Sequence, residues 1–345
     1  MIPIPQLDVS VRLEQDAVRI LDRRAFPHRL VWVTARSAAE VAEAIRDMVT
    51  QSSGPTYAAC AALSLTARQQ ADVSSTEARE ALTEAGQLLV AARPTNNGVR
   101  DAVDDVLARV ADLPEHASTE QIASAAENAA DAHAQSYRDR SRALAEHTVE
   151  LLPDGARLLT HCWMDTYLIE LVRAADRAGK QFSYVATETR PYLQGARLTA
   201  HTLKEMNQNV TLITDGMAAA VLSPQSTLGR IDALVTAADR VSMDGHVFNK
   251  VGTLGAAVAA QAFGVPYYAL VQAPDPQAPT AADVIVEARD GDEVLYVLTE
   301  RTASPLVTRG YYPAFDVTPP QFTTLIVTDR GAFKPADVAE YWEAR

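Results

Sequence analysis

Short runs in which apolar and polar residues alternate open the chain, and such alternation predicts β-strands. From Ser37 to about residue 151 the spacing changes, because apolar residues then recur every three or four positions, as they do in packed helices. A serine followed three residues later by Glu or Gln is typical of a helix start. It occurs at Ser37 and at Ser118. Residues 1–150 therefore predict a small β-meander followed by a helical domain. The three strand-like runs are residues 10–14, 17–21 and 29–34.

After Pro153–Gly155 the pattern alternates between short apolar runs and helical segments. Strands that alternate with helices form βαβ units, which build a parallel sheet with helices on its faces. Residues 151–345 therefore predict a Rossmann-like, doubly wound and mainly parallel α/β domain. No G-x-G-x-x-G follows the first strand and no P-loop is present, so a Rossmann-type dinucleotide site is not expected. The predicted strands are residues 156–162, 182–188, 210–214, 232–238, 266–271 and 323–329.

The composition excludes several classes of function. The chain has 345 residues and a net charge of −13, whereas binding to nucleic acid or to an anionic membrane needs a basic surface. Its start lacks the basic-then-apolar pattern of a signal peptide, and no apolar run approaches the ~18 residues of a membrane span. Cys60 and Cys162 show no metal-ligand spacing. We therefore expect a cytoplasmic protein with reduced thiols and no bound metal.

Polar or reactive side chains follow the ends of five predicted strands. The carboxyl ends of parallel strands lie at one edge of a sheet, where the ligands of open α/β sheets bind. We therefore expect an active site at this edge, with the loop of residues 187–200, TETRPYLQGARLTA, at its rim. The strand-end groups are Cys162, residues 188–190, residues 214–216, residues 239–240 and residues 272–275.

Three of these places could carry chemistry. Cys162, beside a histidine and a helix N-terminus, could have a lowered pKa and act as a base or nucleophile; a buried structural thiol is the alternative. Asp239 could remain protonated in an apolar pocket and act as a general acid, or it could pair with Arg240. Asn249–Lys250, together with Gly252, precede a helix and could bind phosphate through the lysine charge and backbone N–H groups.

Three longer stretches resemble one protein family. They are TETRPYLQGARLTA, AADRVSMDGHVFNKVGT and YPAFDVTPPQFTTLIVTDRG. The same motifs, in the same order, are found in the family of S-methyl-5-thioribose-1-phosphate isomerase, ribose-1,5-bisphosphate isomerase and the regulatory subunits of eukaryotic translation initiation factor 2B. The N-terminal run AVRILDRRAFPHRLVWV resembles the methylthioribose-phosphate enzyme in particular. The resemblance covers nearly the whole chain.

The resemblance implies an intramolecular aldose–ketose isomerase. Its substrate would be an aldose 1-phosphate of the methylthioribose-1-phosphate or ribose-1,5-bisphosphate type, and its product the ketose 1-phosphate. Cys162 and Asp239 match the family's catalytic cysteine and aspartate. No cofactor is implied, and a homodimer or higher homo-oligomer is expected. The implied substrate and phosphate contacts are Ser52, Ser53, Gly54, Arg93, Gln194, Asn249 and Lys250, while Glu188 and Arg190 are expected to brace the rim loop.

The expected chemistry is proton transfer on a sugar whose ring must first open. A protonated Asp239 could donate to the ring oxygen, and a Cys162 thiolate could remove the proton of carbon 2. A hydride shift from carbon 2 to carbon 1 is an alternative. Two other functions remain open: a non-catalytic regulatory subunit that senses a nucleotide or sugar phosphate, and a cysteine-nucleophile hydrolase.

Two departures from the family pattern lie near the expected site. The first phosphate-binding turn is usually Arg-Gly-Ala-Pro, whereas this chain has Ser52-Ser53-Gly54-Pro55. The arginine is lost, although the serine hydroxyls and backbone N–H groups could still hold an anion. Small or polar residues usually follow the cysteine, whereas this chain has Trp163-Met164. Both departures suggest a sugar phosphate different from the family's two best-known substrates.

Overall fold

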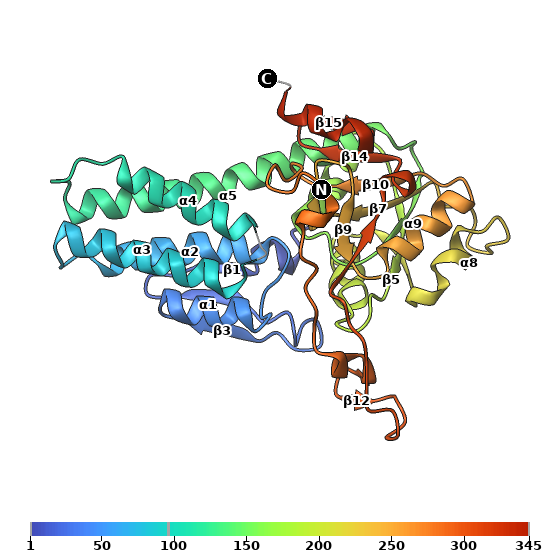
Figure 1. The fold of residues 1–345 in the computed structure, drawn as a ribbon, viewed down its shortest axis with the longest axis horizontal. Helices are drawn as coiled ribbons and strands as arrows, with labels where there is room; N and C mark the ends of the chain where they lie inside the picture. The colour runs from blue at the N-terminus through green and yellow to red at the C-terminus, as the bar shows by residue number, and fades with distance from the viewer. Residues whose placement is uncertain (1, 95–96, 344–345) are drawn as a thin grey trace. The chain divides into compact units, whose positions relative to one another are not determined.

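The chain folds into two compact units, seen in Figure 1 in a computed structural model that describes residues 2–94 and 97–343. One unit is Gln6–Asp139, and the other contains the residues before Gln6 and those from Arg140 onwards. The predicted division at residue 150 falls at the end of helix α5 (Thr119–Glu150), whereas the units divide inside this helix. The reason is that the last part of α5 is hydrogen-bonded to strand-end residues of the second unit, through Arg140 and Ser141.

The Gln6–Asp139 unit combines a three-stranded sheet with a group of helices, as the sequence predicts. The strands pair antiparallel in the order β1-β2-β3, which confirms the meander. Ser37 caps the first helix by accepting the backbone N–H of Glu40. Ser118 and Gln121 form a reciprocal pair of hydrogen bonds at the start of α5. The elements are β1 (Val11–Leu13), β2 (Val18–Leu21), β3 (Trp32–Ala35), α1 (Ala38–Arg46), α2 (Gly54–Gln69), α3 (Ser75–Ala92) and α4 (Asn97–Ala111), with the 3-10 turn η1 (Gln6–Val9).

The second unit contains a seven-stranded sheet, which confirms the predicted α/β class. All six predicted strands form in it and pair parallel; the seventh, β15, is an antiparallel edge strand that the sequence pattern did not predict. The strands are β4 (Arg157–Thr160), β5 (Ser183–Thr187), β6 (Asn209–Ile213), β7 (Ala233–Ala237), β10 (Tyr267–Leu270), β14 (Leu325–Thr328) and β15 (Gly331–Phe333).

The strand order locates the point at which a ligand is expected. From edge to edge it is β15-β14-β10-β7-β4-β5-β6, so the chain starts in the middle with β4, moves outward to β6, and returns to β7 on the other side of β4. The order reverses between β4 and β7, which lie side by side with Leu158 opposite Ala233. In open α/β sheets the crevice outside the carboxyl ends at such a reversal is the binding site.

Helices of very different length connect these strands. α6 packs a buried face of Leu168, Leu171 and Val172, and the rim loop continues as a π-helical turn into the short helix α7. Among the described residues, no helix is long and apolar enough to cross a membrane. The elements are α6 (Thr166–Arg177), η2 (Gly195–Thr199), α7 (Ala200–Glu205), η3 (Asp215–Met217), α8 (Ala218–Leu222), α9 (Thr253–Ala262), η4 (Ala281–Asp283), η5 (Gly291–Leu295), η6 (Pro320–Phe322) and η7 (Pro335–Trp342).

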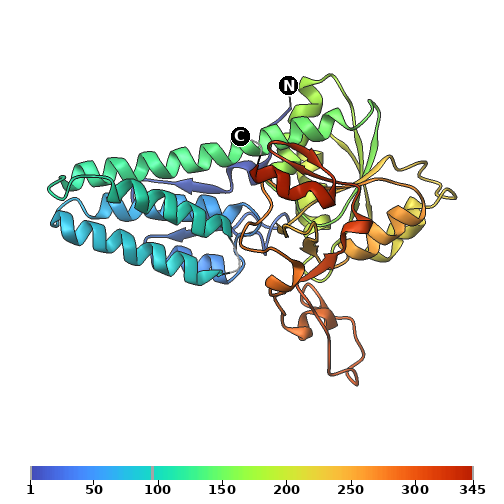
Figure 2. The same cartoon turned by 45° about the horizontal axis from the view of Figure 1, so that its top comes forward.

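A second, small antiparallel sheet was not predicted. Its order is β13-β9-β8, with β13 at Phe315–Thr318, β9 at Val247–Lys250 and β8 at Arg240–Val241. Between α9 and β13 the chain forms an arm, residues 281–311, which includes the hairpin of β11 (Tyr296–Val297) and β12 (Glu300–Arg301). Figure 2 shows the end of this arm projecting away from the sheet.

Candidate functional site

Cys162 and Asp239 lie at the reversal of strand order. Cys162 comes two residues after the end of β4, and Asp239 comes two residues after the end of β7. Cys162 is half-buried, and Asp239 is exposed. The exposure of Asp239 contradicts the expectation that an apolar pocket surrounds its carboxyl group. Its neighbour Arg240 lies 3.3 Å from the carboxylate of Asp275, from Nη1 to Oδ2.

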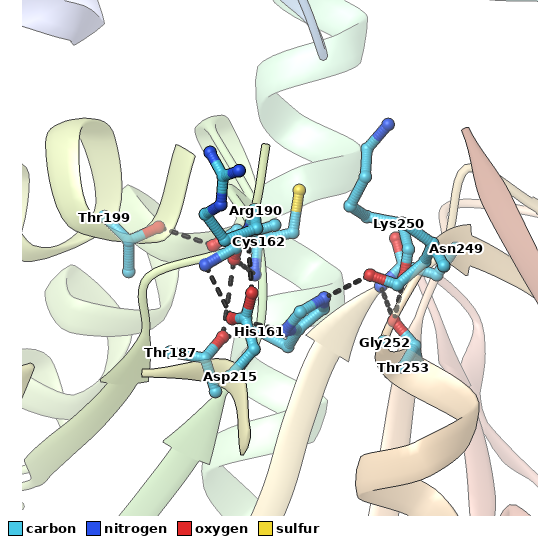
Figure 3. Close-up of polar contacts among 12 residues, drawn as sticks. His161, Cys162, Thr187, Arg190, Thr199, Asp215, Asn249, Lys250, Gly252 and Thr253 are labelled. Atoms are coloured by element: carbon cyan, nitrogen blue, oxygen red, sulfur yellow. Dashed lines mark hydrogen bonds and ion pairs between the residues drawn. The ribbon is translucent and has the colours of Figure 1, made fainter. Parts of the chain in front are cut away.

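The rim loop holds the backbone of Cys162 from two sides. The Cys162 N–H donates to Thr189 Oγ1 over 2.9 Å, and its carbonyl oxygen accepts from Thr199 Oγ1 over 2.6 Å. Figure 3 shows Thr199 beside the backbone of Cys162, with the sulfur projecting away from it. Cys162 has a φ of +70°, which is uncommon outside glycine and persists only where the surroundings fix it. The rim loop is therefore what orients the thiol.

The rim loop is itself fixed by Asp215. The carboxylate of Asp215 accepts the consecutive backbone N–H groups of Thr189 and Arg190, each over 2.7 Å. These bonds hold Thr189 at a φ of +61°, a strained value for a β-branched residue. Gly195 closes the loop, because a Cβ there would lie 1.7 Å from the carbonyl oxygen of Thr187. The sequence indicates Asp215 as a strand-end group but does not predict this role.

His161 is buried and neutral. Its Nε2 lies 2.9 Å from the carbonyl oxygen of Val251, which can only accept, so Nε2 carries the hydrogen. Its Nδ1 then accepts from Thr187 Oγ1 over 2.6 Å. Burial lowers the pKa of His161, and the charge of Asp215 opposes this only in part. A neutral histidine cannot stabilise a neighbouring thiolate by charge.

The pKa of Cys162 is raised, so the expectation of a lowered value is wrong. Burial of the sulfur raises the pKa to about 12; the charge of Lys250 lowers it, that of Asp239 raises it, the N–H of Trp163 lowers it and Asp215 raises it. The resting protein therefore carries a thiol at neutral pH. The effect of Asp239 also indicates that the two predicted catalytic groups lie close enough to interact.

Asn249 and Lys250 end strand β9, and both are buried, with 3% and 8% of their surface exposed. Asn249 Nδ2 donates to Thr253 Oγ1 over 3.0 Å. Figure 3 shows the side chain of Lys250 projecting in the same direction as the sulfur of Cys162. This arrangement offers a positive charge to an anionic substrate beside the thiol.

The start of helix α9 is already capped by a carboxylate. The N–H of Gly252 donates to Asp316 Oδ2 over 2.7 Å, and that of Leu254 lies 3.1 Å from both Asp316 oxygens. This corrects the expectation that these backbone groups are available to phosphate. Burial raises the pKa of Asp316 to about 6, although the hydrogen bonds from Gly252 and Leu254 oppose the rise. Gly252 has a φ of +109°, and a Cβ there would lie 2.8 Å from the ring of His161.

The other predicted residues of this unit, Glu188, Arg190 and Gln194, belong to the rim loop itself. Burial raises the pKa of Glu188, with a further rise from Asp215 and an opposing effect of Arg190. The guanidinium of Arg190 donates to the carbonyl oxygens of Pro191 and Val294, over 3.3 and 3.1 Å. These contacts fit a bracing role. Gln194 is only 1% exposed. Among the described residues, no group of three His, Cys, Asp or Glu side chains could hold a metal ion.

The Ser52-Ser53-Gly54 turn belongs to the other unit and is backed by an unexpected arginine. Arg23 is 1% exposed, and its Nη1 donates to the carbonyl oxygen of Gln51 over 2.7 Å, while Nη2 donates to Ser10 Oγ over 3.0 Å. A Cβ on Gly54 would lie 3.0 Å from Arg23 Nη2. Ser52 is exposed, with a φ of +58°. The turn lacks an arginine of its own, and Arg23 of the β-meander places a guanidinium behind it instead. Sequence reasoning did not single out Arg23.

Arg93, the other predicted phosphate contact of this unit, follows the last residue of helix α3 as its C-cap. Its Nη1 is buried and has no hydrogen-bond partner among residues 2–94 and 97–343. Buried donors are normally paired, so an orphan guanidinium nitrogen fits a residue that binds an anion.

Replacing Arg23 by methionine is expected to lower the free energy of unfolding by about 2–4 kcal/mol, because two buried acceptors lose a charged donor. Urea denaturation measures the change. Arg24→Met is the matched control, since Arg24 is an exposed arginine paired with Asp22 and should cost less than about 1 kcal/mol. Equal losses in the two variants would show that the buried guanidinium does not hold the turn.

Comparisons with known proteins agree with one another. A sequence profile of the Initiation factor 2 subunit family matches residues 50–335. A methylthioribose-1-phosphate isomerase of Anaeromyxobacter sp. (strain K) is 38% identical over 339 residues, which cover 94% of this chain and 93% of that enzyme. The crystal structure of 5-methylthioribose 1-phosphate isomerase from Pyrococcus horikoshii superposes with a TM-score of 0.86 and 28% identity, covering 97% of this chain and 94% of that one. Subunit delta of translation initiation factor eIF-2B from A. fulgidus gives a TM-score of 0.82 and 30% identity, covering 95% and 96%.

Proposed function

The chain belongs to the initiation factor 2 subunit family, and we propose that it is an aldose–ketose isomerase acting on methylthioribose 1-phosphate. The observation that carries the proposal is the pair Cys162 and Asp239, which follow neighbouring strands at the reversal of strand order. Relatives 34–38% identical along more than nine-tenths of the chain are named methylthioribose-1-phosphate isomerases, which favours this substrate over ribose 1,5-bisphosphate.

The reaction needs four proton movements, and two side chains suffice for them. Asp239 gives a proton to the ring oxygen as the bond between that oxygen and carbon 1 breaks. Cys162 takes the proton of carbon 2, which leaves an enol phosphate between carbons 1 and 2. Cys162 then returns the proton to carbon 1, and Asp239 takes the proton of the carbon 2 hydroxyl. The products are the ketose 1-phosphate and both side chains in their starting states.

The raised pKa of Cys162 constrains this scheme. In the unliganded protein the thiol is protonated and Asp239 is exposed to water, so the pair holds its proton on sulfur. The scheme needs the same proton on Asp239. Substrate that covers Asp239 excludes water from the carboxylate, which favours its protonated form. A hydride shift from carbon 2 to carbon 1 is the alternative, and it needs no thiolate.

The phosphate group would be held by charged and amide side chains. Lys250 is a buried cation beside the thiol. Asn249 and Gln194 are buried amides of the predicted set. We also propose a cytoplasmic homodimer or higher homo-oligomer, on the family resemblance alone.

A regulatory subunit is the second candidate, favoured by the 30% identity with the eIF-2B delta subunit over most of both chains. Such a protein would bind a nucleotide or sugar phosphate without turnover. The pair Cys162 and Asp239 at the reversal of strand order favours an enzyme over a regulatory subunit.

The purified protein is expected to convert methylthioribose 1-phosphate to the ketose with a turnover number of about 1–10³ s⁻¹. Ketose formation is measured with this sugar, with ribose 1,5-bisphosphate and with other pentose and deoxypentose 1-phosphates. Tight binding without turnover across the panel would assign the chain to the regulatory type. Faster turnover of another sugar phosphate in the panel would show that Trp163-Met164 or the Ser52–Gly54 turn has changed the substrate preference.

The same assay with deuterium at carbon 2 separates the two mechanisms. Transfer through the Cys162 sulfur allows exchange with water, so product made in ordinary water loses label. Full retention of deuterium at carbon 1 would instead establish the hydride shift.

A further inference from the structure

The ammonium group of Lys250 is packed against two aromatic rings. Its Nζ lies 4.5 Å from the ring centroid of Phe315 and 5.9 Å from that of Tyr312. Phe315 is the cross-strand partner of Lys250 in the small sheet. Tyr312 lies just before this strand, and its carbonyl oxygen accepts the N–H of Arg289 over 2.9 Å. Both rings therefore come from one segment that is tied to β9 and to the base of the arm.

Tyr312 also lies close to the thiol. Its side chain is 6% exposed, whereas the adjacent Tyr311 is 83% exposed. Burial raises the pKa of Tyr312; Glu293 raises it further, Arg289 lowers it, and Cys162 is a further raising group. Tyr312 is thus a neutral phenol whose ring lies near the Lys250 ammonium and which is close enough to Cys162 to interact with it electrostatically.

A buried lysine needs such partners. A lysine has a flexible four-carbon stem, and water would otherwise draw its ammonium outward. The faces of aromatic rings attract a cation within about 6 Å, and the attraction is stronger where water is excluded. The place where the ammonium rests matters to the site, because its charge is the larger of the two influences, with the Trp163 N–H, that lower the pKa of Cys162 against burial, Asp239 and Asp215.

We propose that Tyr312 and Phe315 form an aromatic clamp that fixes the Lys250 ammonium beside the Cys162 thiol, which makes both rings positioning residues of the isomerase site. The role of the clamp in turnover rests on the proposed function. Its effect on the thiol of the substrate-free protein does not. It acts through Lys250, so neither ring is required to touch the reacting carbons.

The direct test is the rate at which iodoacetamide alkylates Cys162 in the intact, substrate-free protein, followed by peptide mass mapping that separates Cys162 from Cys60. Tyr312→Leu and Phe315→Leu are expected to slow alkylation at pH 9 about threefold to tenfold, because the ammonium moves away and less thiolate forms. Removing a ring also admits water, which acts in the opposite direction. A double-mutant cycle with Lys250→Met separates the two effects.

In the Lys250→Met background, Tyr312→Leu should no longer slow alkylation, because the charge that the ring positions is absent. Tyr312→Phe retains the ring, so its alkylation profile between pH 7 and 10 should match that of the wild type. Tyr311→Leu is the matched control for an exposed tyrosine and should leave that profile unchanged. The clamp is refuted if Tyr312→Leu alkylates like wild type, or if it slows alkylation equally with and without Lys250.

Steady-state kinetics on the substrate identified above add a second readout. The Leu variants are expected to raise KM about fivefold to twentyfold, since the phosphate loses a fixed cation, with a smaller change in kcat. An unchanged KM would remove the clamp from substrate binding. If no sugar phosphate is turned over but alkylation depends on the rings through Lys250, the clamp stands and the proposed function falls.

Discussion

Cys162→Ser is expected to reduce kcat by about 10²- to 10⁴-fold while the protein stays folded. Serine keeps the size of the side chain and both backbone hydrogen bonds, to Thr189 and from Thr199, so the orientation of the site should survive. What it loses is acidity, because a hydroxyl gives up its proton far less readily than a thiol. Turnover and thermal unfolding are measured on the same preparation.

Cys60→Ala is the matched control, since Cys60 is the other cysteine of the chain and lies buried in helix α2. Its thiol has a pKa raised to about 12 by burial, with Asp131 and Asp105 adding to the rise. This variant should retain full turnover. A Cys162→Ser enzyme with wild-type kcat would remove the thiol from the mechanism.

The pH profile gives a second measurement of the same group. The reactive arrangement, with the proton on Asp239 and not on Cys162, holds as many protons as the resting one. The ratio of the two arrangements therefore does not depend on pH, and kcat/KM should be constant from about pH 7 to 10. Above that range kcat/KM should fall as the Cys162 thiol, whose pKa is about 12, loses its proton to water.

The lower limit of this level range also follows from the site. The carboxyl group of Asp316 has a pKa of about 6, raised by burial, and its protonation below that pH would weaken the hydrogen bonds from Gly252 and Leu254. A tenfold rise in kcat/KM per pH unit between 7 and 10 would instead mean that the enzyme needs a free thiolate and no protonated partner.

The main sheet could be predicted because its strands are buried on both faces and therefore read as apolar runs. Leu158, Leu159 and Val185, for example, are each at most 2% exposed. Their alternation with helices then indicates parallel pairing, and the ends of parallel strands share one edge of the sheet. This is why Cys162 and Asp239 could be named from the sequence.

The parts that sequence reasoning missed depend on pairings between distant residues. The small sheet has strands of two to four residues, and Asn249 and Lys250 interrupt its apolar pattern. The cap on Gly252 comes from Asp316, and the tautomer of His161 depends on the carbonyl group of Val251. Nothing local in the sequence specifies these partners. The raised pKa of Cys162 has the same origin, because burial is a property of the folded surroundings.

A buried arginine was missed for a different reason. Arg23 follows Asp22 in a short polar break between two apolar runs, where an exposed turn is the normal interpretation. Its burial becomes apparent only when the Gln51–Gly54 segment is placed against it. The loss of an arginine from the turn was visible in the sequence, but its replacement was not.

Asp239→Asn is expected to reduce kcat by about 10²- to 10⁴-fold with little change in stability. Asparagine has the same shape but can neither deliver a proton to the ring oxygen nor accept one from the carbon 2 hydroxyl. Asp239 is exposed, and exposed substitutions usually change stability by less than about 0.5 kcal/mol. The rate of ketose formation is therefore expected to fall steeply, while the midpoint of urea denaturation stays close to that of the wild type.

Two comparisons make this result specific to the catalytic pair. Asp176 is an exposed aspartate near the end of α6, and Asp176→Asn should keep wild-type turnover. The double variant Cys162→Ser with Asp239→Asn should lose scarcely more activity than either single variant, because ring opening by Asp239 and proton removal by Cys162 depend on each other and the two groups fail as a unit. Losses that multiply would mean that Cys162 and Asp239 contribute independently of each other and do not fail as a unit.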